Sequence, residues 1–158
     1  QVGWAIESIR KRLQKSMPKK LRKYFKHSRR LILTRYYRLS NEKKQECDLM
    51  LLYNDDLRKA HYLKEKFYEI CQNPKYSEQR TDFWDWIKEA ESSGIPEFEK
   101  CAKTYRNWSK YILNAYKYSH ISNGPTEGFN NKIKVLKRTS YGIRNFEHFR
   151  TRILMVTN

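Results

Sequence analysis

The sequence predicts a mainly α-helical protein, and three observations support this prediction. The chain of 158 residues contains only five glycines and four prolines, which is too few for a turn-rich all-β fold. Apolar residues recur through most of the chain at the three- and four-residue spacing of one helix face. Residues that favour helix starts, such as Ser40 and Asn54, stand directly before periodic segments.

Start and stop signals place the individual helices. Pro18 ends or interrupts the first helix, Ser40 begins the second, Asn54 or Asp55 caps the third, and Asn73-Pro74 closes it. The expected helices span residues 2–15, about 41–53, about 55–72, 77–91, about 98–118, and two further stretches that begin at about 125 and about 145.

Two segments between the first and second helices are open to more than one interpretation. Residues 19–30 are densely basic, with Tyr24, Phe25 and His27 interleaved, and this composition suits either phosphate contacts with some base stacking or a solvated helix face. Residues 31–37 have the β-branched and aromatic content of a short strand or an extended linker, with a buried helix end as the alternative.

The segment 98–118 carries the longest helical pattern, and aromatic rings dominate its apolar face. The face consists of Phe98, Cys101, Ala102, Tyr105, Trp108, Ile112, Ala115 and Tyr116. A continuous, one-sided stripe predicts packed core, because a base-stacking platform needs exposed rings. The chain has 12 Tyr, 7 Phe and 4 Trp, so we expect a core of large amphipathic rings.

The net charge indicates a polyanionic partner. Lys and Arg number 34 against 17 Asp and Glu, a formal charge of +17, which favours nucleic acid. A membrane is not an expected partner, because no apolar run approaches the roughly 20 residues that span a bilayer and no secretory signal is visible. Cys47, Cys71 and Cys101 form no CxxC pair and are expected to be reduced, packed thiols in a cytoplasmic protein.

The stretch from Ser122 to Leu154 has the strongest chemical pattern. Asn123-Gly124-Pro125 predicts a turn followed by a helix. At about 100° per residue, one polar stripe collects a carboxylate, two carboxamides and two cations, namely Glu127, Asn130, Asn131, Lys134 and Arg138. Phe129, Ile133 and Leu136 fall on the opposite, packing side. The polar stripe suits a metal-dependent phosphodiester site.

The runs NGPTEGFNNKIKVLKR and YGIRNFEHFRTRIL in this stretch resemble the C-terminal signature of bacterial DDE transposases of the ISL-three insertion-sequence family. The resemblance implies that Glu127 is the third member of an Asp-Asp-Glu metal-binding triad. It also implies an α-helical insertion region over residues 1–121, followed by C-terminal helices of an RNase H-like catalytic domain over residues 122–158, with the sheet largely missing. No motif of this sequence matches the family's two aspartates, zinc-binding region or helix-turn-helix, so the chain is expected to be a fragment.

The implied activity of the parent protein is metal-dependent cleavage and strand transfer of transposon DNA. Water attacks a terminal phosphodiester in line, and the freed 3′-hydroxyl then attacks target DNA, with Mg²⁺ or Mn²⁺ as cofactor. The fragment itself is expected to bind no metal and to be inactive, because two of three carboxylates are absent. Expected partners are transposon-end and target DNA and a possible homo-oligomer on DNA.

Individual residues receive roles on the same basis, and each has an ordinary alternative. Glu127 could simply accept hydrogen bonds from free backbone N–H groups at the helix start, a role compatible with metal binding. Asn130 and Asn131 are expected to orient Glu127 or contact DNA, unless they are only an exposed polar face. The expected phosphate-contacting cations are Lys134, Lys137 and Arg138, with additional contacts from Arg144, Arg150 and Arg152.

Two further features complete the hypothesis. Tyr141-Gly142 is expected to form the turn between the last two helices, with Gly142 left-handed and Tyr141 a packing anchor, and His148 is expected to be a surface residue. The competing function is a non-catalytic basic helical module for DNA binding or dimerisation. An RNA-binding protein is disfavoured because the sequence has no RNP-type or GXXG signature.

Overall fold

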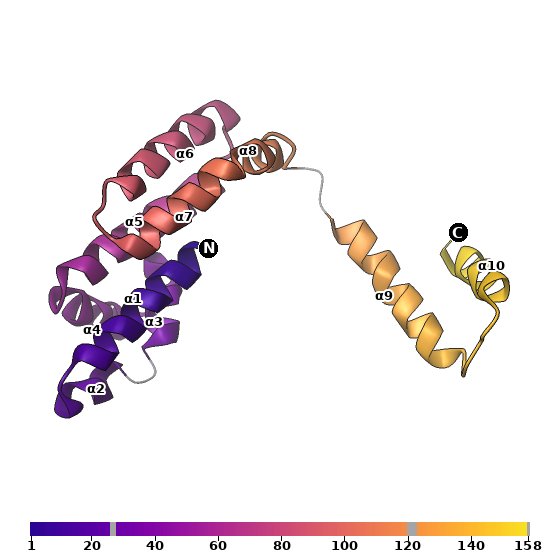
Figure 1. Ribbon diagram of the computed structural model, residues 1–158, viewed down its shortest axis with the longest axis horizontal. Helices are drawn as coiled ribbons and strands as arrows, with labels where there is room; N and C mark the ends of the chain where they lie inside the picture. The colour runs from indigo at the N-terminus through magenta and orange to yellow at the C-terminus, as the bar shows by residue number, and fades with distance from the viewer. Residues whose placement is uncertain (26–27, 120–122, 158) are drawn as a thin grey trace. The chain divides into compact units, whose positions relative to one another are not determined.

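The computed structural model describes every residue except 26–27, 120–122 and 158, and its regular elements in this part of the chain are all helices. The predicted mainly α fold is therefore confirmed (Figure 1). The elements are α1 Val2–Ser16, α2 Lys19–Phe25, α3 Arg29–Leu33, η1 Tyr36–Arg38, α4 Asn41–Leu52, α5 Asp55–Gln72, α6 Tyr76–Glu91, α7 Pro96–Asn107, α8 Ser109–Lys117, α9 Gly124–Thr139 and α10 Phe146–Thr157.

The chain divides into two compact units, Gln1–Lys117 and Tyr118–Asn158. The predicted boundary between residues 121 and 122 lies outside the described residues, as do His27 and the side chain of Tyr24. The assignment of the two parts to an insertion region and a catalytic domain stays a prediction. None of the described helices combines the length and apolarity needed to cross a bilayer.

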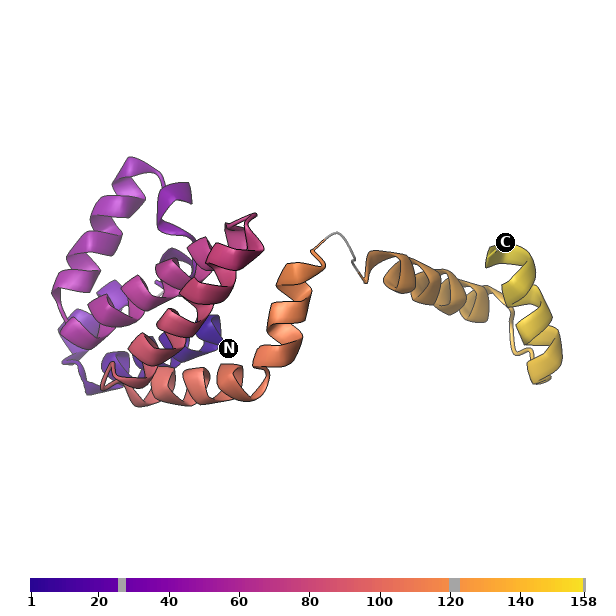
Figure 2. The same cartoon turned by 90° about the horizontal axis from the view of Figure 1, so that it is seen from above.

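Four helices enclose the core of the first unit. α1 packs against α5 and α7, and α6 packs against the same two helices (Figure 1; Figure 2). Large rings fill the centre, as predicted, and Trp86 is fully buried with its ring centroid 4.9 Å from that of Phe67. The Trp86 Nε1–H group donates to the Leu63 carbonyl at 2.8 Å, so burial leaves this polar atom satisfied.

Local signals placed several helix ends correctly. Ser40 caps α4 by accepting a hydrogen bond from the Lys43 backbone N–H at 3.4 Å, and Asn54 caps α5 by accepting from Leu57 N–H at 3.0 Å. These side chains satisfy N–H groups that have no partner within the helix, which is why the residue type predicts the position.

The strand predicted for residues 31–37 is wrong, and the alternative of a buried helix end fits the structure. α3 ends at Leu33 with Ile32 fully buried, and η1 begins three residues later at Tyr36. The buried Lys64 ammonium of α5 donates to the carbonyls of Ile32 at 2.7 Å and Thr34 at 3.0 Å. Because Lys64 satisfies these main-chain oxygens, the segment has no need of a neighbouring strand.

The single helix predicted over 98–118 is also wrong, because the chain turns at Trp108 into the separate helix α8. Phe98, Cys101 and Ala102 are buried as predicted, but Trp108 is 58% exposed. The change of direction rotates the aromatic stripe, so that Ala115 is exposed while Tyr116 still reaches Phe83, with ring centroids 6.0 Å apart. The prediction of packed thiols holds for Cys47 and Cys101 but not for the exposed Cys71.

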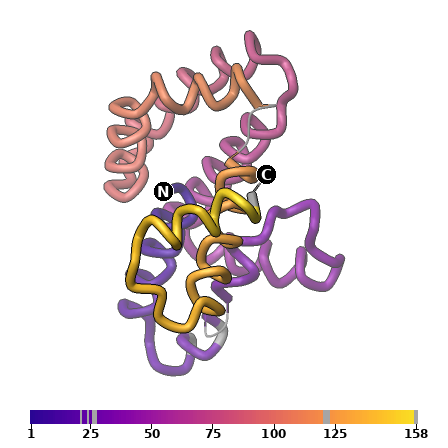
Figure 3. The backbone as a smooth tube through the Cα atoms, turned by 90° about the vertical axis from the view of Figure 1, so that its right-hand side faces the viewer, coloured from indigo at the N-terminus to yellow at the C-terminus, as the bar shows by residue number. Residues whose placement is uncertain are grey.

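The second unit is a helical hairpin in which α9 and α10 contact each other (Figure 3). Its half-buried residues are Ile133, Leu136, Ser140, Ile143, Phe149 and Ile153. Phe129, which the periodicity placed on the packing side of its helix, is 45% exposed, and Phe146 at the start of α10 is 69% exposed. They extend beyond the contact between the two helices, and a two-helix unit offers them no further surface to cover them.

Candidate nucleic-acid interface

The turn before α9 holds Glu127 at the start of the helix. Gly124 is the first helical residue and Pro125 follows it, where the missing proline N–H has no helical partner to lose. The Glu127 backbone N–H donates to the Asn123 carbonyl at 2.9 Å, and the Asn123 side-chain N–H donates to the Glu127 carboxylate at 3.3 Å. Asn123 therefore positions the carboxylate from both its main chain and its side chain.

The polar stripe of α9 faces away from α10. Glu127, Asn130, Asn131, Lys134 and Arg138 are all exposed, whereas Ile133 and Leu136 are half-buried. The helical period thus distributes the side chains as expected, with a solvated chemical side and a packed side. The five polar side chains are therefore accessible from solvent.

Positive charge dominates the second unit. Residues 118–158 contain seven Lys and Arg and two acidic residues, Glu127 and Glu147. Among the described residues, Lys134, Lys137, Arg138, Arg144 and Arg152 have no carboxylate within ion-pair distance, while Arg150 lies 3.4 Å from Glu147. Cations without a carboxylate partner are available to phosphate oxygens, and Arg150 would have to exchange its partner first.

The connection between α9 and α10 contains two left-handed residues. Gly142 has φ of 86°, as predicted, and Tyr141 has φ of 38° and is 96% exposed. The role of Tyr141 as a packing anchor is therefore wrong, because the left-handed backbone directs its ring into solvent. His148 is exposed on α10, as predicted. Asn145 caps α10 by accepting from the backbone N–H of Glu147 at 2.9 Å.

The described residues contain no group of three or more His, Cys, Asp or Glu side chains that could hold a metal ion. Glu127 is thus a single oxygen ligand, and the neighbouring carboxamides of Asn130 and Asn131 add neutral oxygens only. A divalent ion that prefers six oxygen ligands needs carboxylates beyond those of this face. The metal-binding role of Glu127 and the DNA contacts of the cations stay predictions.

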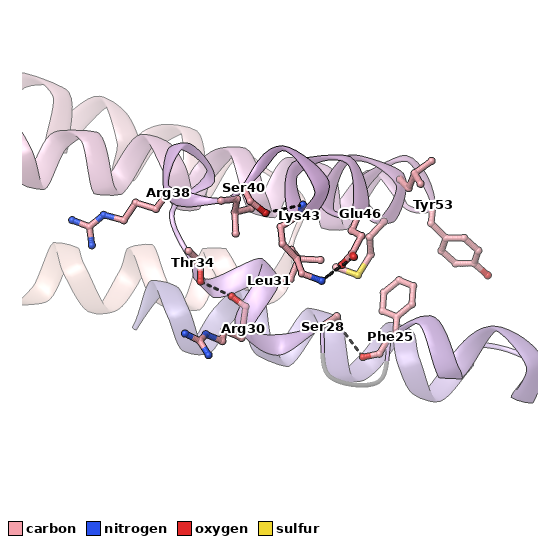
Figure 4. A pocket seen from close by; sticks show the side chains of 13 residues that line it. Phe25, Ser28, Arg30, Leu31, Thr34, Arg38, Ser40, Lys43, Glu46 and Tyr53 are labelled. Atoms are coloured by element: carbon pink, nitrogen blue, oxygen red, sulfur yellow. Dashed lines mark hydrogen bonds and ion pairs between the residues drawn. The ribbon is translucent and has the colours of Figure 1, made fainter.

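The sequence interpretation missed a groove in the first unit. It has a volume of about 960 Å³ and lies between α3 and α4, with Leu31 and Met50 among its lining residues (Figure 4). The cations at its edge differ in availability, because Lys43 pairs with Glu46 at 2.7 Å whereas the guanidinium groups of Arg30 and Arg38 extend away from the other lining side chains. No pattern in the sequence identified this groove, because its two sides are separate helices.

A buried polar cluster in the first unit was missed as well. His61 and Lys64 of α5 are 6% and 0% exposed, and His61 Nε2 lies 3.9 Å from Cys47 Sγ and 3.6 Å from a Glu65 carboxylate oxygen. Burial, with the nearby Lys64 charge, lowers the pKa of His61 to about 4, and burial raises the pKa of Cys47 to about 11. The imidazole and the thiol are thus neutral at physiological pH.

Comparisons with known proteins cover most of the chain. A family model described as a transposase, of the DDE type and the ISL3 group, matches residues 1–153. The transposase for insertion sequence element IS1001 of Bordetella parapertussis is 30% identical over 131 residues, which are 81% of this chain and 31% of that protein. A protein of Lactococcus lactis subsp. lactis named as an ATP-dependent protease is 36% identical over 91 residues, which are 56% of this chain and 29% of that protein.

The chain spans less than one third of the length of these two curated relatives. No solved structure matches it.

Proposed function

We propose, because the chain belongs to the ISL-three family of DDE transposases, that it presents a metal-binding carboxylate and phosphate-binding cations to transposon DNA. This family membership also confirms the resemblance seen around Glu127. The parent protein would cleave DNA and transfer the strand, and this chain would supply one part of the catalytic site. DNA, at the transposon end and at the target, is the proposed partner, and a cytoplasmic location and assembly into a homo-oligomer on DNA are proposed with it.

The observation that carries this proposal is the position of Glu127. Its carboxylate is exposed at the start of α9, is fixed by Asn123, and lies on the same helix side as Lys134 and Arg138. A metal-dependent phosphodiester site requires a carboxylate next to cations that can hold the DNA backbone. The basic residues further along α9 would keep the phosphates in register while the carboxylate end lies at the scissile bond.

Mg²⁺ or Mn²⁺ fits this chain only as part of a larger site. Glu127 would provide one oxygen ligand, and two further carboxylates would have to join it, because the described residues form no group of three or more metal-binding side chains. When bound, such an ion lowers the pKa of a coordinated water and stabilises charge on the phosphate. The residues of this chain would orient that ligand through Asn123 and position the DNA through Lys134, Lys137 and Arg138.

A cleavage assay on the complete transposase tests the assignment of Glu127. Glu127→Gln removes the negative charge while keeping the size of the side chain, and it is expected to reduce cleavage of a labelled transposon end by at least roughly a thousandfold, because the metal site loses a charged ligand. DNA binding by the same variant is expected to persist, since the cations of α9 and α10 remain.

Glu147→Gln is the matched control, because Glu147 is the other carboxylate of residues 118–158 and lies exposed on α10. Cleavage by this variant is expected to stay within about twofold of wild type, since surface substitutions of this kind rarely alter a distant site. Full cleavage by Glu127→Gln would instead favour the competing function, a non-catalytic basic helical module for DNA binding or dimerisation.

A further inference from the structure

The excess positive charge is confined to two regions of the chain. Residues 1–40 contain thirteen Lys and Arg and one acidic residue, Glu7, whereas residues 41–117 contain fourteen of each sign. The first unit thus consists of a strongly basic part, α1 to η1, and an electroneutral part, α4 to α8. A surface charged only for solubility would carry positive and negative side chains mixed together. The separation of a basic part from an electroneutral part therefore requires another explanation.

The one acidic residue of the basic region neutralises little of its charge. Glu7 is buried and receives two hydrogen bonds from Arg10, with Lys11 and Arg29 3.8 Å and 3.9 Å away. Arg12 is neutralised from elsewhere in the unit, because it pairs with Glu97 of α7 at 2.9 Å. These ion pairs use a minority of the thirteen cations.

Several remaining cations are exposed and have no carboxylate partner among the described residues. They are Lys15 at the end of α1, Lys19 and Lys20 at the start of α2, and Arg30 on α3. Lys19 and Lys20 occupy the first turn of a helix, where the dipole disfavours positive charge. The chain therefore keeps these cations at a cost in stability that no ion pair within the described residues offsets.

Hydrogen bonds to main-chain carbonyls join α1 to α2, the two helices that carry three of these cations. The Arg10 guanidinium donates to the Phe25 carbonyl at 3.1 Å, and Arg22 donates to the carbonyls of Met17 at 2.8 Å and Lys15 at 2.9 Å. These bonds connect the middle and the end of α1 to α2 without using a carboxylate. The charges are thus presented on an ordered scaffold, as backbone recognition requires.

We propose that the exposed cations of α1, α2 and α3 bind the phosphate backbone of duplex DNA, as a second DNA surface separate from α9 and α10. This inference rests on the proposed function for the choice of DNA as the polyanion. The surface would hold DNA without reading its sequence, because four flexible side chains without a groove-filling element contact phosphates and not base edges.

Three variants with the same change in net charge test this surface. The first replaces Lys15, Lys19, Lys20 and Arg30 by Gln. The matched control replaces Lys59, Arg80, Lys103 and Lys110 by Gln, which are exposed cations of the electroneutral part without an ion-pair partner among the described residues. The third replaces Lys134, Lys137, Arg138 and Arg144 by Gln on the second unit.

Affinity of the chain for a labelled duplex is measured by fluorescence anisotropy from low to physiological salt. The α1–α3 variant is expected to bind about tenfold more weakly, and its plot of log affinity against log salt should flatten by about 0.9 for each phosphate that the variant no longer neutralises. The control should stay within about twofold of wild type, because a distant charge acts only through the screened long-range field. Far-ultraviolet circular dichroism verifies that each variant keeps its helix content.

A measurement on the wild-type chain makes the test independent of the variants. Acetylation of lysines in the presence of duplex DNA, followed by mass spectrometry, should show protection of Lys15, Lys19 and Lys20 but not of Lys59 and Lys103. Equal protection of both groups, or equal weakening by the α1–α3 and control variants, would overturn the second surface while the third variant still tests the α9 cations.

Two other results would also decide against this surface. Wild-type chain that does not bind duplex DNA would refute both this inference and the DNA contacts of the proposed function. Binding to vesicles of anionic lipid with no measurable DNA affinity would show that the exposed cations of α1, α2 and α3 recognise a membrane surface instead.

Discussion

Protonation of His61 should destabilise the first unit at mildly acidic pH. The imidazole is buried between α4 and α5, next to Cys47 and Glu65, with the Tyr36 ring edge-on at 6.1 Å. Burial and the Lys64 charge oppose a positive imidazole, while Glu65 and Asp48 favour it, and the net result lowers the pKa to about 4. In the unfolded chain the pKa returns to the ordinary value of 6.5.

The size of the effect follows from the two pKa values. Because the unfolded state binds the proton more tightly, stability is lost as the pH falls from about 6.5 toward about 4. At pH 5 the unfolded histidine is almost fully protonated and the folded one is mostly neutral. This pH lies roughly 1.5 units below the unfolded pKa, so proton uptake by the unfolded state lowers the free energy of unfolding by about 2 kcal/mol. The carboxylate of Glu7, whose pKa is lowered by its hydrogen bond from Arg10, adds its own loss only at lower pH.

Urea unfolding monitored by circular dichroism at pH 7 and pH 5 measures this loss. The wild-type chain should lose about 2 kcal/mol of unfolding free energy between the two values. His61→Phe keeps the ring but cannot be protonated, so its loss should be at most roughly 0.5 kcal/mol, whatever its stability at pH 7. His148→Phe, on the exposed side of α10, is the control and should keep the wild-type pH dependence.

A His61→Phe chain that loses as much stability between pH 7 and pH 5 as the wild type would refute this reasoning. It would mean either that water reaches the imidazole in the folded state or that the loss comes from other groups.

Two further predictions concern side chains that build the first unit. Arg10→Met should lower the unfolding free energy by about 3 kcal/mol, because it removes both hydrogen bonds to the buried Glu7 carboxylate, and the added change Glu7→Leu should recover most of this in urea unfolding. No recovery in the double variant would contradict a charge-pair explanation. Asn54→Ala should cost about 1 kcal/mol by the same measurement through loss of the α5 cap, whereas Asn54→Asp should be nearly neutral, and equal effects of the two changes would argue against capping.

Sequence reasoning succeeded where the cause of a structure is local. Ser40 and Asn54 begin their helices because each side chain accepts a hydrogen bond from a backbone N–H three residues later. The exposed polar stripe of α9 could also be predicted from the sequence, because the helical period alone separates Glu127 and Lys134 from Ile133.

It failed where distant residues decide the outcome. Residues 31–37 were expected to form a strand or an extended linker because the sequence does not show that Lys64, thirty-two positions after Ile32, donates to its carbonyl. Trp108 continued a regular apolar pattern, yet the chain turns there and the ring remains exposed. The role of Glu127 rests on family membership and chemistry, since the described residues form no group of three or more metal-binding side chains.

Lys64 gives the molecule an internal reporter. Its amine is enclosed by Ile32, Thr34, Glu65 and the Tyr68 ring, so an amine-directed reagent has no access while α3 and η1 are in position. Labelling of this one lysine would therefore record detachment of that segment from α5. The lysines at the surface, by contrast, react at once, and their labelling reports only whether a bound partner covers them.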